Sequence, residues 1–331
     1  DPCCGSGGTF VQSIKLVDRH NGNRTNISVL GQESQPETWR LCKMNLAVRG
    51  IAHDLGKKNG STFQDDQHRD RKVDFIMANP PFNLKNWRKE DELTTDPRFA
   101  GYETMPPVSN ANYAWILHMI SKLDATDGIA GFLLANGALN SDDEYLIRKQ
   151  IIEQDLVEAI IVLPRDMFYT TDISVTLWII NMNKKAGERN GRKLRDRSGE
   201  TLFIDLRRWN DNIDVIQIDQ KSRKKKVAFT DEQIAQVKAI YNSWQSADTS
   251  QYQDVPELCK AVRIEGEDGI RANNYSLAPS KYIEFIDHDL NIDYETEMRR
   301  IQKEMSELLT LEKQSQAMLI DAFKGIGYGI D

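Results

Sequence analysis

Two short segments of the sequence contain groups that could do chemistry. The first, Asn79-Pro80-Pro81-Phe82, follows the apolar run at residues 75–78. Each proline fixes its own φ angle and restrains the residue before it, so these four residues form a rigid shelf. The Asn79 side-chain oxygen and the Pro80 carbonyl could both accept hydrogen bonds from one exocyclic amino group, while Phe82 offers a stacking face. This suits a nucleobase amine, although a proline turn after a buried strand is more often structural.

The second segment is the Gly-rich stretch at residues 1–8, Asp-Pro-Cys-Cys-Gly-Ser-Gly-Gly. Its three glycines let the backbone turn tightly and approach a ligand before a helical stretch at residues 10–18. The stretch lacks the Lys-Ser/Thr of a phosphate-binding loop and the G-x-G-x-x-G spacing of a dinucleotide site. The pattern therefore favours a cradle for a cofactor that is not bound through phosphate, with a simple tight turn as the alternative.

These two segments, with Gln32-Glu33 between them, resemble the S-adenosylmethionine-dependent amino-methyltransferases, in the order found in N6-adenine DNA methyltransferases. Further matches extend the resemblance over nearly the whole chain, to the modification subunit of type I restriction-modification systems. They lie at residues 112–115, 128–139, 163–168 and 274–282. That family carries a sizeable helical region before the Gly-rich loop, whereas this sequence begins at the loop.

The resemblance implies a site-specific, adenine-specific DNA methyltransferase that acts on a flipped base. Asn79, Pro80, Pro81 and Phe82 would be catalytic, and no metal is expected. The amino nitrogen of adenine is a poor nucleophile because its lone pair is delocalised, and accepting both N–H hydrogens would localise that pair. Phe82 would stack on one face of the base and Phe168 on the other, with Tyr169 as the alternative to Phe168 and a purely structural Phe168 as a third reading.

The cofactor expected from the resemblance is S-adenosyl-L-methionine. Glu33 would accept hydrogen bonds from both ribose hydroxyls, and Asp1 would pair with the amino group of the methionine end. Family members often carry an Asp near Thr62, where this sequence has Ser61, so Asn59 or Asp65 are alternatives for contacting the adenine ring. The full set of expected cofactor-binding residues is Asp1, Cys4, Gly5, Ser6, Gly7, Gly8, Glu33, Ser61 and Asn79.

Composition limits the class of protein. At 331 residues with 40% hydrophobic content, the chain can bury a large core, and its length suggests two domains. The four cysteines, Cys3, Cys4, Cys42 and Cys259, lack a ligand-like spacing, which predicts reduced thiols in a cytoplasm. The resemblance implies that this cytoplasm is bacterial or archaeal. No apolar run approaches the roughly 18 residues of a membrane span, and no signal-peptide pattern is present, so no membrane association is expected.

The charge balance bears on how DNA would be held. The net charge of -7 is unfavourable for a protein that grips double-stranded DNA unaided. Two basic clusters, at residues 184–197 and 221–226, are candidates for DNA contact, although most such runs are solvated loops. The polar segment 184–199 is predicted to be an exposed loop. The resemblance implies that a separate specificity subunit selects the DNA sequence.

Alternating strand-like and helix-like segments predict an α/β fold, a doubly wound and mostly parallel Rossmann-like sheet. The strand-length apolar segments lie at residues 27–31, 75–78, 128–135, 156–163, 175–181 and 201–206. The helical segments lie at residues 38–49, 113–123 and 230–244. Asn112 is expected to cap the second of these helices, and residues before Asp1 are expected to form the first strand.

The predicted domains are a catalytic domain at residues 1–220 and a mainly helical region at 221–331. The latter ends in a long helix at about 292–324, with apolar residues at Met298, Ile301, Met305 and Leu308. This helix either packs on its own domain or docks on the specificity subunit, as the resemblance implies. A restriction subunit and a second modification subunit are further partners that the resemblance allows.

Two other functions remain open from the sequence. The same cofactor and shelf could serve a protein glutamine or an RNA base amine, because such shelves also occur in those methyltransferases. Alternatively, the chain could be an inactive scaffold that binds a partner through its terminal helix. The DNA recognition sequence cannot be read from these residues.

Overall fold

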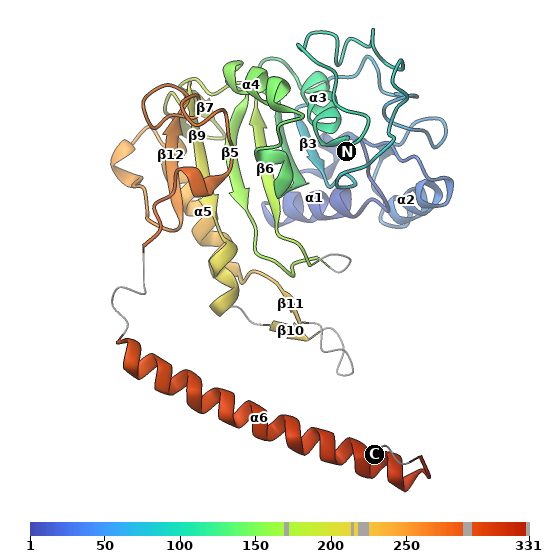
Figure 1. The fold of residues 1–331 in the computed structure, drawn as a ribbon. Helices are drawn as coiled ribbons and strands as arrows, with labels where there is room; N and C mark the ends of the chain where they lie inside the picture. The colour runs from blue at the N-terminus through green and yellow to red at the C-terminus, as the bar shows by residue number, and fades with distance from the viewer. Residues whose placement is uncertain (169–171, 213–214, 218–224, 287–292, 329–331) are drawn as a thin grey trace. The chain divides into compact units, whose positions relative to one another are not determined.

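The computed structural model describes residues 1–168, 172–212, 215–217, 225–286 and 293–328 (Figure 1). Two compact units make up the chain, Asp1–Glu284 and Phe285–Asp331. This division falls between residues 284 and 285, and the domain boundary at residue 220 stays a prediction. No helix in the described part of the chain is long and apolar enough to cross a membrane.

A six-stranded sheet is the centre of the first unit. Its order is β12-β9-β5-β6-β4-β3, and β3, β4, β5 and β9 run in one direction while β6 and β12 run against them. The bounds are β3 Phe75–Ala78, β4 Ile129–Ala135, β5 Val157–Val162, β6 Val175–Asn181, β9 Glu200–Asp205 and β12 Cys259–Arg263. The prediction of a mostly parallel α/β sheet is therefore confirmed, and β3 is an edge strand.

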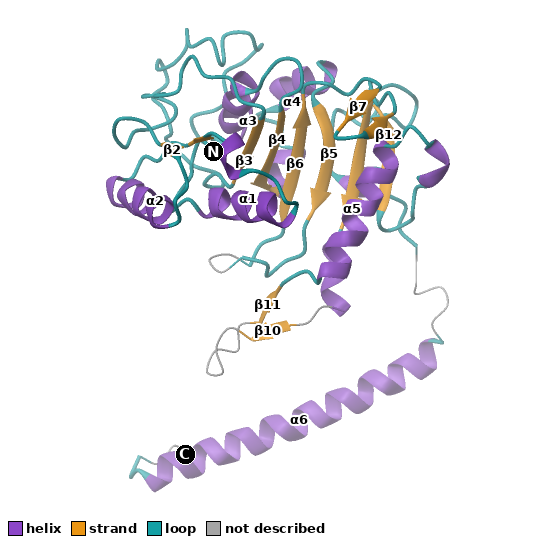
Figure 2. Ribbon diagram, turned by 180° about the vertical axis from the view of Figure 1, so that it is seen from behind, coloured by secondary structure: helices purple, strands orange, loops and turns teal. Residues whose placement is uncertain are grey.

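Helices cover both faces of this sheet (Figures 1 and 2). One face packs against α3 (Asn112–Lys122) and α4 (Tyr145–Glu153) in the largest buried cluster, and the other packs against α5 (Asp231–Gln245). A separate cluster joins α1 (Gly8–Arg19) and α2 (Pro36–Val48) to a short parallel pair, β1 (Val29–Leu30) and β2 (His53–Asp54). This second cluster carries the Gly-rich loop.

The predicted helices are present, with one correction at a cap. Thr230 caps α5 with a complete capping box, in which its side chain accepts from the Gln233 backbone. The N-cap of α3 is Ala111, however, so the prediction that Asn112 caps this helix is wrong. Asn112 is fully buried, and its side chain bonds instead to Asn83.

The predicted basic loop at residues 184–199 is exposed over most of residues 185–193, as expected, but it is not a loop and its ends are not exposed. The segment forms a hairpin of β7 (Gly187–Arg189) and β8 (Arg192–Leu194), and its two ends are buried. Lys184 pairs with Asp155 at 2.5 Å, and Arg197 pairs with Glu158 at 3.0 Å. These two cations anchor the hairpin to the sheet, which makes them unavailable to DNA. The second basic run, at residues 221–226, falls mostly outside the described residues.

The remaining short elements connect these parts. A second hairpin pairs β10 (Val215–Gln217) with β11 (Lys225–Val227). The 3-10 helices are Arg24–Asn26, Asn136–Leu139, Arg207–Asn212, Thr249–Gln251 and Pro279–Lys281.

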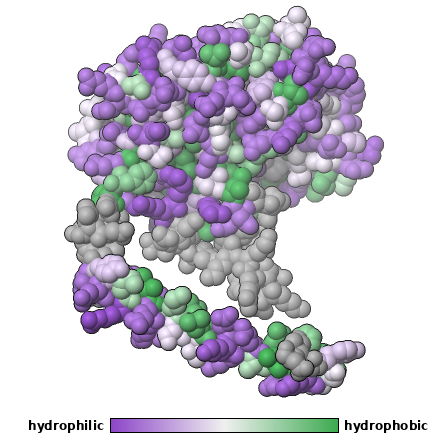
Figure 3. Space-filling view, in the orientation of Figure 1, coloured by the Kyte–Doolittle hydropathy of each residue, from purple (hydrophilic) through white to green (hydrophobic). Residues whose placement is uncertain are grey.

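The second unit contains α6 (Tyr294–Gly325), a helix of 32 residues that confirms the predicted long helix. Asp293 caps its first turn, and Arg300 forms ion pairs with Glu297 and Glu304 along its length. No residue of α6 is buried, and the apolar residues Met298, Ile301, Met305 and Leu308 lie in the sequence spacing of one helix face. Figure 3 shows apolar side chains along this helix between charged ones.

Candidate active site

The Gly-rich loop turns into α1 at Gly7, the N-cap residue, which has a φ angle of 80°. A Cβ atom on Gly7 would lie 2.8 Å from the Cys42 sulfur, so this position requires glycine for its conformation and for its space. Gly5 also has a positive φ angle, 52°, but a Cβ atom there would meet no atom within 4 Å. The loop therefore packs Gly7 against α2 and leaves open space at Gly5.

The other predicted residues of the loop have different surroundings. Asp1 accepts a hydrogen bond from the Cys3 backbone at 3.0 Å, and Ser6 is exposed while its carbonyl accepts from the Asn45 side chain. Cys4 is buried, its sulfur 3.9 Å from that of Cys42. Gly8 is exposed and begins α1. Cys4 supports the packing of α2, whereas the exposed members lie where a ligand can reach them.

Glu33 lies directly against this loop. Its Oε2 atom accepts from the Gly5 backbone at 3.1 Å, and its Oε1 atom accepts from the Gln35 backbone at 2.8 Å. The Oε1 atom also accepts from the Ser34 hydroxyl at 3.4 Å. A carboxylate has about four acceptor sites, so the Oε2 atom keeps one site for a ligand hydroxyl. The side chain is thus held in place without being saturated.

The shelf follows the edge strand β3 and lies beside the Gly-rich loop. Burial raises the pKa of the Cys3 thiol to about 12, against the opposing effect of a hydrogen bond from the Asn79 backbone. That contact joins the two segments, and both ribbon views place the N-terminal residues next to β3 (Figures 1 and 2). Pro80 is buried and Pro81 is exposed, while the exposed Asn79 side chain has no hydrogen-bond partner among the described residues. Its amide oxygen is therefore available to a substrate.

A pair of asparagines fixes the far end of the shelf. Asn83 has a φ angle of 53°, and its backbone N–H donates to the Asn112 side-chain oxygen at 3.0 Å. The Asn112 amide nitrogen donates back to the Asn83 side chain at 2.9 Å. Sequence reasoning missed this role of Asn112, because the partner lies far away along the chain and no local pattern marks the pair.

The predicted adenine-contacting position has an internal partner. The Ser61 hydroxyl donates to the Gln64 side chain and accepts from the Phe63 backbone at 3.3 Å. The alternatives are engaged as well, because Asn59 donates to the Ser34 carbonyl at 2.8 Å and Asp65 pairs with Lys58 at 3.2 Å. Ser61 can offer a ligand one remaining acceptor site, and the half-exposed Asp65 carboxylate can offer more.

Arg98 anchors the loop that contains Ser61 and Asp65, a role that sequence reasoning missed. Its guanidinium donates to the carbonyls of Thr62 and Phe63, at 2.8 and 2.6 Å, and pairs with Asp96 at 2.7 Å. It also lies 3.0 Å from the His118 ring. Burial, with the Arg98 charge beside it, lowers the pKa of His118 to about 3, so this imidazole is neutral at physiological pH.

Phe82 and Phe168 are both half-buried, at the carboxyl ends of β3 and β5. In the sheet, β6 and β4 separate these strands, which places their axes roughly 14 Å apart. No ring contact joins Phe82 and Phe168 in the described part of the chain, and Tyr169 lies outside it. The loop after β5 must therefore reach across β6 and β4 if Phe168 is to share a base with the shelf.

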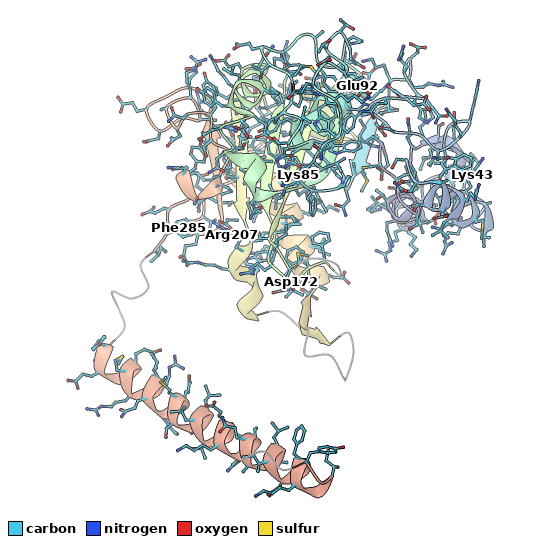
Figure 4. All side chains as sticks on the ribbon, turned by 45° about the vertical axis from the view of Figure 1, so that its right-hand side comes forward. Lys43, Lys85, Glu92, Asp172, Arg207 and Phe285 are labelled. Atoms are coloured by element: carbon cyan, nitrogen blue, oxygen red, sulfur yellow. The ribbon has the colours of Figure 1, made fainter. Side chains whose placement is uncertain are left out.

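Charged side chains are also present at this edge of the sheet. Arg207 follows β9 and pairs with Asp205 at 2.5 Å, and Asp172 precedes β6, which runs in the opposite direction (Figure 4). Lys85 follows the shelf and is exposed. Lys85 is thus a cation close in sequence to the shelf, a suitable position for a phosphate contact.

Comparisons with known proteins identify the family of this chain. The family model described as N-6 DNA Methylase matches residues 1–289. The chain is 39% identical over 331 residues to the type I restriction enzyme HindI methylase subunit of Haemophilus influenzae, covering 99% of this chain and 68% of that protein. It is 32% identical over 332 residues to the MjaIX methylase subunit of Methanocaldococcus jannaschii, covering 99% of this chain and 55% of that protein. The chain thus spans about half to two thirds of these relatives.

Solved structures show the same fold at lower identity. The methyltransferase subunit of a type I restriction-modification system from Streptococcus thermophilus has a TM-score of 0.64 and 24% identity, over 86% of this chain and 53% of that one. The type I restriction enzyme EcoKI M protein (EC 2.1.1.72) has a TM-score of 0.60 and 17% identity, over 95% and 68%. Because the family model matches most of the chain and the HindI methylase subunit is 39% identical, this chain belongs to the N-6 DNA methylase family, with the methylase subunits of type I restriction enzymes as its relatives.

Proposed function

We propose that this chain transfers a methyl group from S-adenosylmethionine to the exocyclic N6 atom of an adenine flipped out of double-stranded DNA. The observation that carries the proposal is the position of the Asn79 side chain. It is exposed at the end of β3 with no hydrogen-bond partner among the described residues, and its backbone contacts the Gly-rich loop at Cys3. A base-binding acceptor and a cofactor cradle are thus neighbours, as group transfer between two bound molecules requires.

The cradle fits S-adenosylmethionine. The open space at Gly5 and the spare acceptor site on the Glu33 Oε2 atom suit a ribose hydroxyl, and Asp1 supplies a carboxylate for an ammonium group. Ser6 and Gly8 are exposed beside them. When bound, the cofactor supplies a methyl group on a positively charged sulfur.

Asn79 acts on the amine of the target base. Its amide oxygen and the Pro80 carbonyl accept the two N–H hydrogens, which draws the nitrogen lone pair out of the aromatic ring and stabilises the positive charge that develops on the nitrogen. A neutral acceptor is suited to this position because a carboxylate would bring a full charge into a site that excludes water. The proton leaves to solvent after the transfer.

Flipping the base costs a few kcal/mol of stacking and pairing. Stacking on Phe82 offsets roughly 1–3 kcal/mol of this cost, and Phe168 would supply the second face by way of the loop after β5. The Asn112–Asn83 pair keeps Phe82 in place by fixing the backbone that follows it.

DNA binding is proposed to depend on a partner. The net charge is -7, and two of the basic side chains at the ends of segment 184–197, Lys184 and Arg197, are buried in ion pairs. The exposed apolar residues of α6 offer a surface for the helices of a specificity subunit, which would select the DNA sequence. A second modification subunit and a restriction subunit would complete the assembly, in a bacterial or archaeal cytoplasm.

Asn79→Ala tests the assignment, in the full-length protein with its specificity subunit. The expected result is wild-type affinity for S-adenosylmethionine by calorimetry and a loss of about 100- to 1,000-fold in kcat, the usual effect of removing one such hydrogen-bonding group. Methylation is measured as transfer of labelled methyl to DNA, with N6-methyladenine identified by mass spectrometry. Asn242→Ala on α5, an identical substitution whose side chain makes no hydrogen bond among the described residues, is the matched control.

Two outcomes would reject the proposal. Label that appears in transfer RNA or in protein, with none in DNA, would favour the alternative acceptors. An Asn79→Ala protein that retains kcat within threefold of the wild type would show that the shelf is not the catalytic centre.

A further inference from the structure

Gln32 connects the loops around the cofactor cradle from a buried position. Its side chain is only 2% exposed. Its amide nitrogen donates to the carbonyls of Gly60 and Asp65, at 3.1 and 2.6 Å, and its amide oxygen accepts from the Gln67 backbone at 3.2 Å. Both N–H hydrogens are thus used within the protein, so Gln32 is not a ligand contact.

The backbone of Gln32 is bound to the Gly-rich loop at the same time. Its N–H donates to the Asp1 carbonyl at 3.1 Å, and its carbonyl accepts from the Cys4 N–H at 2.9 Å. The next residue continues the connection, because the Glu33 carbonyl accepts from the Gly60 N–H at 2.9 Å. Residues 1–5, 32–33 and 60–67 are therefore joined through one buried side chain and the backbone on either side of it.

We propose that Gln32 is a positioning residue for the cofactor, which holds residues 60–67 in place beside the Glu33 carboxylate. This rests on the proposed function, since it assumes that S-adenosylmethionine occupies the cradle. The loop that Gln32 holds contains Ser61 and Asp65, whose remaining acceptor sites lie where the nucleoside end of the ligand would be recognised. A loop already fixed in its binding conformation loses little entropy when the ligand binds, which raises the affinity.

A second side chain holds this loop independently of Gln32. Arg98 bonds to the carbonyls of Thr62 and Phe63, and Phe63 packs between Trp87 and Trp115 with ring centroids 4.7 and 4.3 Å apart. Removing the Gln32 amide therefore releases the two ends of the loop and leaves its middle anchored. The chain is expected to fold without this amide, and the effect should fall on the ligand.

The test is Gln32→Met, which keeps the length of the side chain and removes the three hydrogen bonds. We expect the Kd for S-adenosylmethionine to rise about tenfold, with kcat at saturating cofactor within twofold of the wild type and with KM raised in parallel with Kd. Gln32→Glu should bind more weakly still, because its carboxylate would face the Gly60 and Asp65 carbonyl oxygens. Gln154→Met, on an exposed glutamine at the end of α4, should leave Kd unchanged.

Calorimetry on the full-length protein distinguishes the outcomes. If the wild type does not bind S-adenosylmethionine, both the proposed function and this inference are refuted. If the wild type binds and Gln32→Met has a Kd within twofold of it, the positioning role is refuted while the proposed function stands. A lower binding stoichiometry with an unchanged Kd would also refute the role, because it would show that the amide affects only the fraction of folded molecules.

Discussion

Outside the active site, breaking the ion pair between Glu158 and Arg197 should reduce the stability of the fold more than any other single change to a charged pair. Glu158, on β5, and Arg197, after β8, are 0% and 1% exposed. The Glu158 carboxylate accepts from Arg197 and Gln245, each at 3.0 Å, and from Asn181 at 2.6 Å. Arg197→Met would remove the cation that donates to this buried carboxylate and leave it with the neutral donors Gln245 and Asn181.

Removing one member of a buried ion pair costs roughly 3–5 kcal/mol of unfolding free energy, because the remaining charge stays out of water without compensation. With a urea m-value of about 3 kcal/mol/M, the unfolding midpoint should fall by roughly 1–2 M. Replacing both charges should recover most of this loss, since an apolar pair of similar volume is often as stable as the ion pair. Glu158→Met in the Arg197→Met protein is therefore expected to restore the midpoint.

Urea unfolding at pH 7.5, followed by tryptophan fluorescence and circular dichroism, measures these midpoints. Arg300→Met is the matched control, because Arg300 forms its ion pairs on the exposed surface of α6 and its loss should not shift the transition. The reasoning is refuted if Arg197→Met shifts the midpoint by less than about 0.3 M, or if the double variant is no more stable than Arg197→Met alone.

Two further predictions concern the titration of a buried histidine and the surface of α6. The folded pKa of His118, about 3, lies below its unfolded value of about 6.5, so the unfolded chain binds a proton that the folded chain rejects. The contribution of His118 to the free energy of unfolding is complete above pH 6.5 and should fall by about 2 kcal/mol between pH 7 and 5. In His118→Gln, the urea midpoint should therefore fall less steeply over this pH range than in the wild type, and an equally steep fall would contradict the prediction. Ile301→Glu should abolish co-purification with the proposed specificity subunit and leave cofactor binding unchanged. Lys303→Glu, on the other side of α6, should still co-purify with that subunit, and equal co-purification of both variants would exclude this surface of α6 as the docking site.

The sequence was sufficient to predict those parts of the fold that depend on local patterns. The helices α2, α3, α5 and α6 and the strands β3 to β6 begin and end close to their predicted positions, because apolar spacing and capping residues lie within each element. The proximity of the shelf and the Gly-rich loop could also be predicted, since both follow from the order of a parallel sheet.

Interactions between distant residues explain the errors. The hairpin and the buried ends of residues 184–199 could not be predicted, because the ion-pair partners Asp155 and Glu158 lie elsewhere in the sequence, before and within β5, and no rule of composition predicts a buried pair. Asn112 precedes a helix and so fits the pattern of a cap, but its side chain serves Asn83. The side chains of Gln32 and Arg98 donate to backbone carbonyl groups. Every residue type has such a carbonyl, so the sequence does not reveal these partners.

The reversed direction of β6 has a consequence for how this protein can change. The connection from β5 to β6 begins and ends on the same side of the sheet, at the carboxyl end of β5. Two hydrogen bonds close its base: the Leu163 N–H donates to the Val175 carbonyl at 2.8 Å, and the Ser174 hydroxyl donates to the Leu163 carbonyl at 2.6 Å. Insertions beyond this closure would leave every strand pairing intact, and doubling the length of such a loop costs only about 0.6 kcal/mol. Natural or engineered variants could therefore lengthen this connection to contact other substrates while keeping the same scaffold.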